Sequence, residues 1–112
     1  MLKKLSVVVL ATTILSFGST AFAKGDAKAG KKVYDQNCTS CHGAKGKGDG
    51  AAAAALNPKP NNFSLGKFKY GSGDADLAKT IKNGKGPMPP WGAVLSGKDV
   101  DNVIAYIRSL KK

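Results

Sequence analysis

The sequence predicts an all-α fold in one small domain, and three observations support this. Three segments carry apolar residues at helical spacing and begin at residues that can cap a helix. Residues 43–73 between them are rich in Gly, Pro, Asn and Lys, which predicts a long loop. No segment has the pattern of a strand, and there is no internal repeat or second domain.

The first predicted helix covers residues 26–37. Asp26 is its expected cap, and Ala29, Val33 and Tyr34 lie along one side. In the loop that follows, residues 51–56 are expected to form one or two helical turns.

The second predicted helix covers residues 74–83, with Asp74 as its cap and Leu77 and Ile81 four residues apart. Gly84 closes it. Residues 86–91 contain three prolines, which exclude regular helix and predict a stiff, extended segment.

The last helix is the clearest. Ser96 is expected to cap it, with Asp99 as its partner in a capping box. Arg108 and the basic residues after it suit the negative end of the helix dipole. Its apolar stripe consists of Val100, Val103, Ile104, Ile107 and Leu110.

The first 23 residues predict a signal peptide. Lys3 and Lys4 precede the mostly apolar residues 5–17, and Ala21 and Ala23 fit a cleavage site. The apolar stretch is shorter than the ~20 residues of a membrane-spanning helix, so no stable membrane anchor is expected. We expect export to the periplasm, cleavage near Ala23 and a mature domain at residues 24–112.

The mature chain would keep 16 of the 18 basic residues and all seven acidic ones, a net charge of about +9. This favours an acidic partner, although solubility alone also explains a basic surface. Nucleic acid is not expected, because basic and aromatic residues do not interleave and an exported protein rarely meets it. With 89 residues, the domain needs more than an apolar core for stability.

The segment Cys38-Thr39-Ser40-Cys41-His42 is the strongest chemical motif. Its spacing lets the two thiols of Cys38 and Cys41 add to the vinyl groups of one haem, with His42 as proximal iron ligand. A zinc site would need more ligands, and His42 is the only histidine. A thioredoxin-like redox pair would be expected near a βαβ pattern, which is absent.

Met88 is the only methionine of the mature chain and is the candidate for the sixth iron position. Its thioether is a soft, neutral donor that raises the reduction potential, as suits an electron carrier. The alternative is that Met88 fills a gap in the core. The metal ligands are therefore predicted to be His42 and Met88, on one covalently attached haem c with its iron.

These residues stand in an order that resembles class I c-type cytochromes over essentially the whole mature length. The matching segments are Gly30 and Tyr34, Cys38 to His42, Gly46 to Gly50, Asn57 to Phe63, Met88-Pro89 and Tyr106. The resemblance implies the cytochrome c fold, with the first and last helices crossing and the haem wrapped by loops. It implies that Gly30 allows close approach to Tyr106.

One departure from the family pattern concerns Ala51. Members often have proline directly after the Gly-Asp-Gly segment, with a carbonyl that accepts a hydrogen bond from the proximal histidine. Here Ala51 stands at that position, and we expect its carbonyl, or that of a neighbour, to hold His42.

Other residues carry weaker expectations. Residues 46–50 should form a turn around the haem, and Trp91 should pack beside it. Four lysines near the ligand segments could ring an exposed haem edge, or be ordinary solvated surface. They are Lys45, Lys47, Lys82 and Lys85.

The predicted function is outer-sphere transfer of single electrons to redox partner proteins, by a monomer that is not an enzyme. The alternatives are a haem subunit of a larger oxidase or reductase, or a small haem peroxidase or gas sensor with an open sixth site. The peroxidase would need a distal acid and base, for which the chain offers no second histidine.

Overall fold

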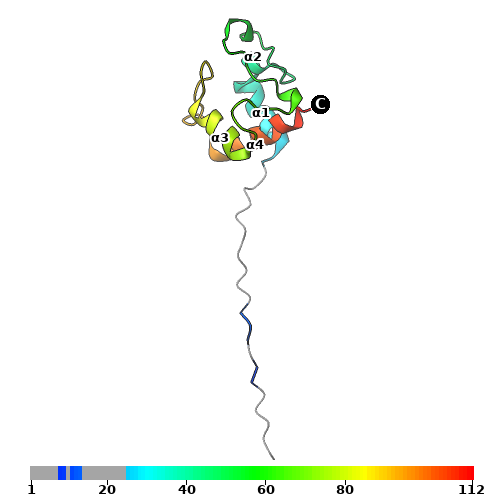
Figure 1. Cartoon of the computed structure of the whole chain (residues 1–112), viewed down its shortest axis with the longest axis vertical. Helices are drawn as coiled ribbons and strands as arrows, with labels where there is room; N and C mark the ends of the chain where they lie inside the picture. The colour runs from blue at the N-terminus through cyan, green and yellow to red at the C-terminus, as the bar shows by residue number, and fades with distance from the viewer. Residues whose placement is uncertain (1–7, 10, 14–24) are drawn as a thin grey trace, which may run out of the picture.

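The computed structural model describes residues 8–9, 11–13 and 25–112 (Figure 1). The predicted cleavage site near Ala23 lies outside the described residues, as does most of the predicted signal peptide. Within the described ranges the chain forms helices, one isolated bridge between Lys85 and Met88, and no strand, so the all-α fold is confirmed. None of these helices has the length and apolar character of a membrane span.

Two helices near the ends of the domain form its centre. Helix α1 (Ala27–Asn37) packs against α4 (Gly97–Ser109), and α3 (Asp74–Asn83) packs on α4 (Figure 1). The connection between α1 and α3 contains one short helix and two 3-10 turns. These are α2 (Thr39–His42), η1 (Ala53–Ala55) and η2 (Phe63–Leu65).

The caps of α1 and α4 are those that the sequence predicts. Asp26 accepts a hydrogen bond from the Lys28 N–H at the start of α1. At the start of α4, Ser96 and Asp99 exchange two hydrogen bonds between side chain and backbone, each 3.1 Å long. Both arrangements satisfy N–H groups that a helix leaves without partners.

The cap of α3 differs from the prediction. Gly73 is the capping residue, and its N–H donates to Asp76 Oδ2 at 3.1 Å, whereas Asp74 is the first residue of the helix. The carboxylate of Asp74 is instead bound by Arg108 of α4. The side chain that the local pattern assigns to the cap therefore binds a residue distant in the sequence.

The core is built around α4, as its stripe predicts. Val100, Val103, Ile104 and Ile107 are all buried, and Leu110 is half-buried at its edge. Facing them are Tyr34 of α1, Leu77 and Ile81 of α3, and Phe63 of η2. Of the five residues predicted to face the core from these two helices, Tyr34, Leu77 and Ile81 are buried, whereas Ala29 and Val33 are half-buried.

Gly30 is the point of closest approach between α1 and α4. A Cβ atom there would lie 1.9 Å from the Asn102 carbonyl oxygen, so only glycine allows this contact. The backbone that approaches Gly30 most closely is therefore that of Asn102. Tyr106 packs one turn further on, edge-on against Tyr34 with ring centroids 5.0 Å apart.

Asn102 also fixes the start of α1. Its side chain is buried, and its Oδ1 accepts a hydrogen bond of 2.8 Å from the Asp26 N–H. Because a buried amide must be hydrogen-bonded, this contact sets the register of the two helices.

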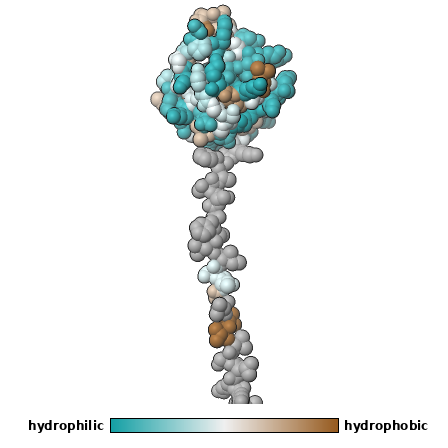
Figure 2. All heavy atoms as spheres, viewed as in Figure 1, coloured by the Kyte–Doolittle hydropathy of each residue, from teal (hydrophilic) through white to brown (hydrophobic). Residues whose placement is uncertain are grey.

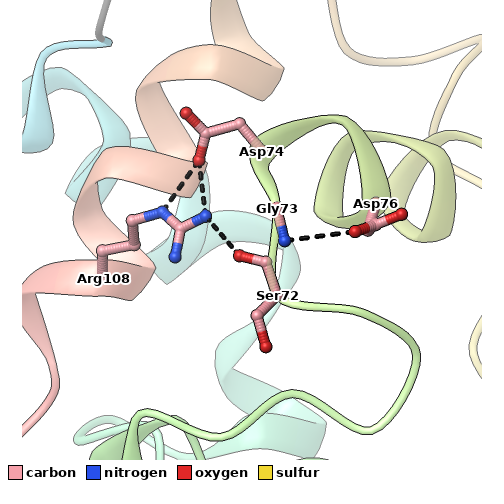
Figure 3. Close-up of polar contacts among 5 residues, drawn as sticks. All are labelled: Ser72, Gly73, Asp74, Asp76 and Arg108. Atoms are coloured by element: carbon pink, nitrogen blue, oxygen red, sulfur yellow. Dashed lines mark hydrogen bonds and ion pairs between the residues drawn. The ribbon is translucent and has the colours of Figure 1, made fainter.

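Arg108 joins the far end of α4 to the start of α3 (Figure 3). Its guanidinium donates to Asp74 Oδ1 from Nε at 2.8 Å and to the Ser72 carbonyl at 2.7 Å. Its central carbon also lies 5.6 Å from the centre of the Phe68 ring. The connection before α3 is therefore held against α4 by an exposed side chain.

Candidate functional site

The cysteine motif forms a single turn of helix, which the sequence did not predict. Cys38 ends α1 and begins α2, and its N–H donates to the Tyr34 carbonyl at 2.8 Å. The His42 N–H in turn donates to the Cys38 carbonyl at 2.9 Å. The turn brings both cysteines and His42 to the wall of one cavity.

This cavity has a volume of about 330 Å³ and gathers all four residues that the sequence assigned to the site. Cys38, Cys41 and His42 come from α2 and its cap, and Met88 comes from the segment after α3. Most of the remaining wall is apolar, from Phe68, Leu77, Ile81, Trp91, Leu95 and Ile107. Such a cavity suits a large, apolar ligand held by a few polar atoms.

The imidazole of His42 is held by a carbonyl group. Its Nδ1 lies 3.2 Å from the Asn61 carbonyl oxygen, which can only accept, so Nδ1 carries the proton. Nε2 is then the nitrogen with a free lone pair. Burial lowers the pKa of His42, and the hydrogen bond to Asn61 opposes this only in part. A neutral imidazole with an oriented ring is the form that binds a metal.

The carbonyl that holds His42 is therefore not the one expected. We predicted Ala51 or a neighbour, but the acceptor is Asn61, nineteen residues after His42. The backbone of residues 48–52 is instead hydrogen-bonded to the backbone of the cysteine motif. The N–H groups of Gly48 and Ala52 donate to the carbonyls of His42 and Ser40, at 2.8 and 2.9 Å.

The glycine-rich residues 46–50 lie beside the motif and do not line the cavity, contrary to the expected turn around a haem. A Cβ at Gly50 would lie 2.3 Å from the Ser40 carbonyl oxygen, and one at Gly48 would lie 2.5 Å from the Pro60 carbonyl oxygen. Gly50 is therefore needed for close packing on α2, and Gly48 for close packing on Pro60.

Met88 lies on a tight turn, which is more compact than the extended segment that the prolines predicted. Lys85 and Met88 exchange two backbone hydrogen bonds, of 3.1 and 3.0 Å. Beyond the turn, the Trp91 N–H donates to the Ile81 carbonyl of α3 at 2.9 Å. The half-buried Trp91 lines the cavity and packs on the core, as expected.

The two cysteines form no disulfide with each other, and the surroundings of Cys38 do not suit a redox pair. Burial, and to a lesser extent the neighbouring Cys41, raises the pKa of the Cys38 thiol to about 11. Reactive thiols in disulfide exchange have a lowered pKa instead. In the described ranges, no group of three or more His, Cys, Asp or Glu side chains lies close enough together to hold a metal ion.

Phe63 and Asn61 have roles at the site that the sequence did not assign. The Phe63 ring stacks on the His42 imidazole, with centroids 4.4 Å apart and planes inclined by 19°. Both residues lie within residues 57–63, one of the segments that resemble the family, but no local pattern identifies which of these residues contacts His42.

Three lysines line the cavity, namely Lys59, Lys69 and Lys85. Of the four lysines expected to surround it, only Lys85 does so. Its Nζ lies 5.0 Å from the centre of the Tyr70 ring, which also lines the cavity. Spacing along the chain could not find Lys59 and Lys69, because they lie far from both ligand segments in the sequence.

In sequence, the chain is similar to a family of cytochrome domains and to several named cytochromes. Residues 25–107 match the family described as cytochrome c oxidase, cbb3-type, subunit III. Cytochrome c-554(547) of Halothiobacillus neapolitanus is 42% identical over 94 residues, which are 78% of this chain and 99% of that protein. Cytochrome c6 of Picosynechococcus sp. is 37% identical over 110 residues, which are 95% of this chain and 92% of that protein.

Some relatives are much longer. Subunit CcoP of the cbb3-type cytochrome c oxidase of Azospirillum brasilense is 33% identical over 102 residues, which are 90% of this chain and 34% of that protein. The chain thus spans about a third of this relative's length.

Solved structures show the same fold. A chain of the reducing HAO-like protein complex of Kuenenia stuttgartiensis superposes with a TM-score of 0.70 at 32% identity, covering 79% of this chain and 44% of that one. Cytochrome c6 of the diatom Phaeodactylum tricornutum superposes with a TM-score of 0.60 at 26% identity, covering 76% and 93%.

Proposed function

The chain belongs to the class I c-type cytochromes, which transfer electrons through haem c and its iron, and from this we propose that it is a periplasmic single-haem carrier. In this proposal the signal peptide is removed near Ala23, and the mature protein acts as a monomer. Cys38 and Cys41 bind the haem covalently, and His42 and Met88 are its axial ligands.

The observation that carries the proposal is the meeting of these four side chains at one apolar cavity. Haem supplies an iron that changes oxidation state by one electron. The residues of the chain supply the rest. Cys38 and Cys41 would hold the haem covalently. The hydrogen bond from Nδ1 orients the His42 ring, and the closed turn at residues 85–88 limits the positions open to the Met88 thioether.

The wall of the cavity favours a carrier over a catalyst. Its titratable residues are the two cysteines, His42, Tyr70 and the three lysines, and no carboxylate lines it in the described ranges. A peroxidase needs a distal acid and base that move protons at the open iron position. With Met88 in that position, no side chain of the wall is placed for such a role.

The charge distribution favours an acidic partner. Five of the seven acidic residues are engaged, because Asp26, Asp76 and Asp99 cap helices while Asp35 and Asp74 pair with Lys31 and Arg108. None of the cavity lysines forms an ion pair with a described residue. The face drawn in Figure 2 is mainly hydrophilic with small hydrophobic groups, as suits brief docking.

A second candidate is a haem module of a larger oxidase or reductase complex. It is favoured by the match to the cbb3-type subunit III family and by the longer CcoP relative. In this case a haem in the same cavity, with the same ligands, would exchange electrons with one permanently bound subunit. Gel filtration of the protein expressed in its source cell separates the two, because a module would elute with its complex.

An optical spectrum of the purified protein tests the site. The oxidised protein should show a weak far-red charge-transfer band from iron bound to methionine sulfur, and should not bind carbon monoxide readily when reduced. Denatured protein should keep the haem on the chain, and its mass should correspond to residues 24–112 plus one haem. A missing band together with rapid carbon monoxide binding would contradict the proposed function as an electron carrier.

A further inference from the structure

The side chain of Asn61 has no role in the proposed function, yet it makes two hydrogen bonds, and the backbone carbonyl of the same residue makes a third. Its backbone carbonyl accepts from His42 Nδ1 at 3.2 Å. Its Nδ2 donates to the Lys67 carbonyl at 2.9 Å, and its Oδ1 accepts a longer bond of 3.4 Å from the Lys69 N–H. One residue thus joins the imidazole to a second segment of the chain.

That second segment, residues 67–71, forms part of the cavity wall. Phe68, Lys69, Tyr70 and Gly71 all line the cavity. In the described ranges its backbone makes no regular secondary structure, so it depends on side chains for its position. Asn61 holds its beginning, and Arg108 holds the connection after it through the Ser72 carbonyl (Figure 3).

The peptide group that carries the Asn61 carbonyl is fixed from both sides. After it, the Asn62 side chain caps η2 by accepting from the Ser64 N–H at 3.0 Å. Before it, Pro60 has a restricted φ angle. The Asn61 carboxamide adds a third restraint, since its bonds to segment 67–71 limit rotation of the residue whose carbonyl faces His42.

We propose that Asn61 is a positioning residue, whose carboxamide holds its own carbonyl at His42 Nδ1 and couples segment 67–71 to the imidazole. This rests on the proposed function, in which His42 is an iron ligand. A stronger hydrogen bond at Nδ1 makes the imidazole more basic and favours the oxidised iron. Loss of the carboxamide should therefore weaken this bond and raise the reduction potential.

The test compares variants of the full, haem-loaded protein by NMR of the reduced form and by redox titration. In Asn61→Ala, the Lys69 amide and the His42 Nδ1–H should exchange with solvent faster by about fivefold or more, as expected for loss of an ordinary hydrogen bond. The potential should shift upward. Asn61→Ser, whose hydroxyl is too short for both bonds, should behave alike and replaces Asn61→Ala if the latter folds poorly.

Two controls separate positioning from general loosening. Asn83→Ala removes an exposed asparagine whose side chain makes no hydrogen bond to a described residue, and should leave all three readouts unchanged. Arg108→Gln frees the connection after segment 67–71 without touching Asn61, and should leave the His42 Nδ1–H exchange within about twofold.

An unchanged Nδ1–H and potential in both Asn61 variants would overturn the proposal. So would an equal effect of Arg108→Gln, because the effect would then follow from a loosened wall. The exchange rates are read whatever the sixth ligand is. A protein that lacks the methionine band but shows the Asn61 effect would therefore contradict Met88 ligation alone.

Discussion

The imidazole of His42 and the ring of Phe63 are stacked, with centroids 4.4 Å apart and planes inclined by 19°. Phe63 is 7% exposed, and its ring also meets Tyr34 edge-on at 6.4 Å and Phe68 at 6.0 Å. The imidazole of His42 thus packs on an aromatic cluster that is part of the core around α4. The orientation of the His42 ring is therefore tied to the packing of the core.

Replacing Phe63 tests this link. Phe63→Leu keeps most of the volume and should cost about 1 kcal/mol of unfolding free energy, whereas Phe63→Ala should cost about 3–5 kcal/mol. Phe63→Leu should also shift the NMR signals of the His42 ring. Phe68→Leu is the control, since its ring touches Phe63 rather than stacking on His42 in this way. Equal shifts in both variants would contradict a specific stack.

Gly30 should tolerate no side chain. In Gly30→Ala the new methyl would lie 1.9 Å from the Asn102 carbonyl oxygen, and two helix backbones cannot separate without loss of the core. We expect a loss of about 3 kcal/mol or more in urea unfolding. Gly97→Ala is the matched control, because a Cβ there would meet no described atom within 4 Å outside its own turn of helix. The unfolding free energy of that variant should be unchanged or rise by up to about 1 kcal/mol. A similar loss in both variants would indicate that alanine destabilises the helices themselves, and not the contact between them.

The hydroxyl of Tyr34 should contribute measurably to stability. It donates a buried hydrogen bond of 2.6 Å to the Gly43 carbonyl, directly after the motif. Tyr34→Phe removes this bond, although the carbonyl keeps the Gly46 N–H as a donor at 3.1 Å, and should lower the unfolding free energy by about 0.5–1.5 kcal/mol. The exposed Tyr70 makes no hydroxyl hydrogen bond in the described ranges, so Tyr70→Phe should change it by less than about 0.5 kcal/mol. Equal losses would show that the bond contributes nothing specific.

Met88 variants should separate ligation from packing. Met88→Leu keeps the apolar volume but removes the sulfur, so the far-red band should disappear and the reduced protein should bind carbon monoxide. Met88→His should lower the reduction potential, because a second imidazole favours the oxidised iron more than a thioether does. Trp91→Phe alters the same wall and should keep the band. A band that persists in Met88→Leu would exclude Met88 as the ligand.

The cavity lysines should govern the rate of docking. Replacing Lys59, Lys69 and Lys85 by Gln removes three charges from the cavity wall, and should slow electron exchange with an acidic partner by about tenfold or more at low salt. The control replaces Lys28, Lys32 and Lys98, which are exposed and do not line the cavity. Rates that fall equally in both variants would indicate net charge alone, without a docking surface.

Much of the fold could be predicted because its signals are local. The Ser96 and Asp99 cap lies within one turn of helix, and the apolar stripe of α4 repeats at helical spacing, so neither depends on distant parts of the chain. The cap of α3 was predicted wrongly for the opposite reason. Asp74 binds Arg108, 34 residues away, which no local pattern reveals.

The sequence by itself determined which residues could serve as haem anchors and ligands, because the Cys38 to His42 spacing and the single Met88 leave few choices. Only the tertiary structure decided how they are held. The carbonyl of Asn61 and not that of Ala51 meets His42, and the carbonyl of Asn102 meets Gly30, because both contacts depend on the path of the chain between distant segments. Residue type determines the chemistry of a side chain, but its partner across the fold is determined by packing, which satisfies buried polar groups and fills the core at the same time.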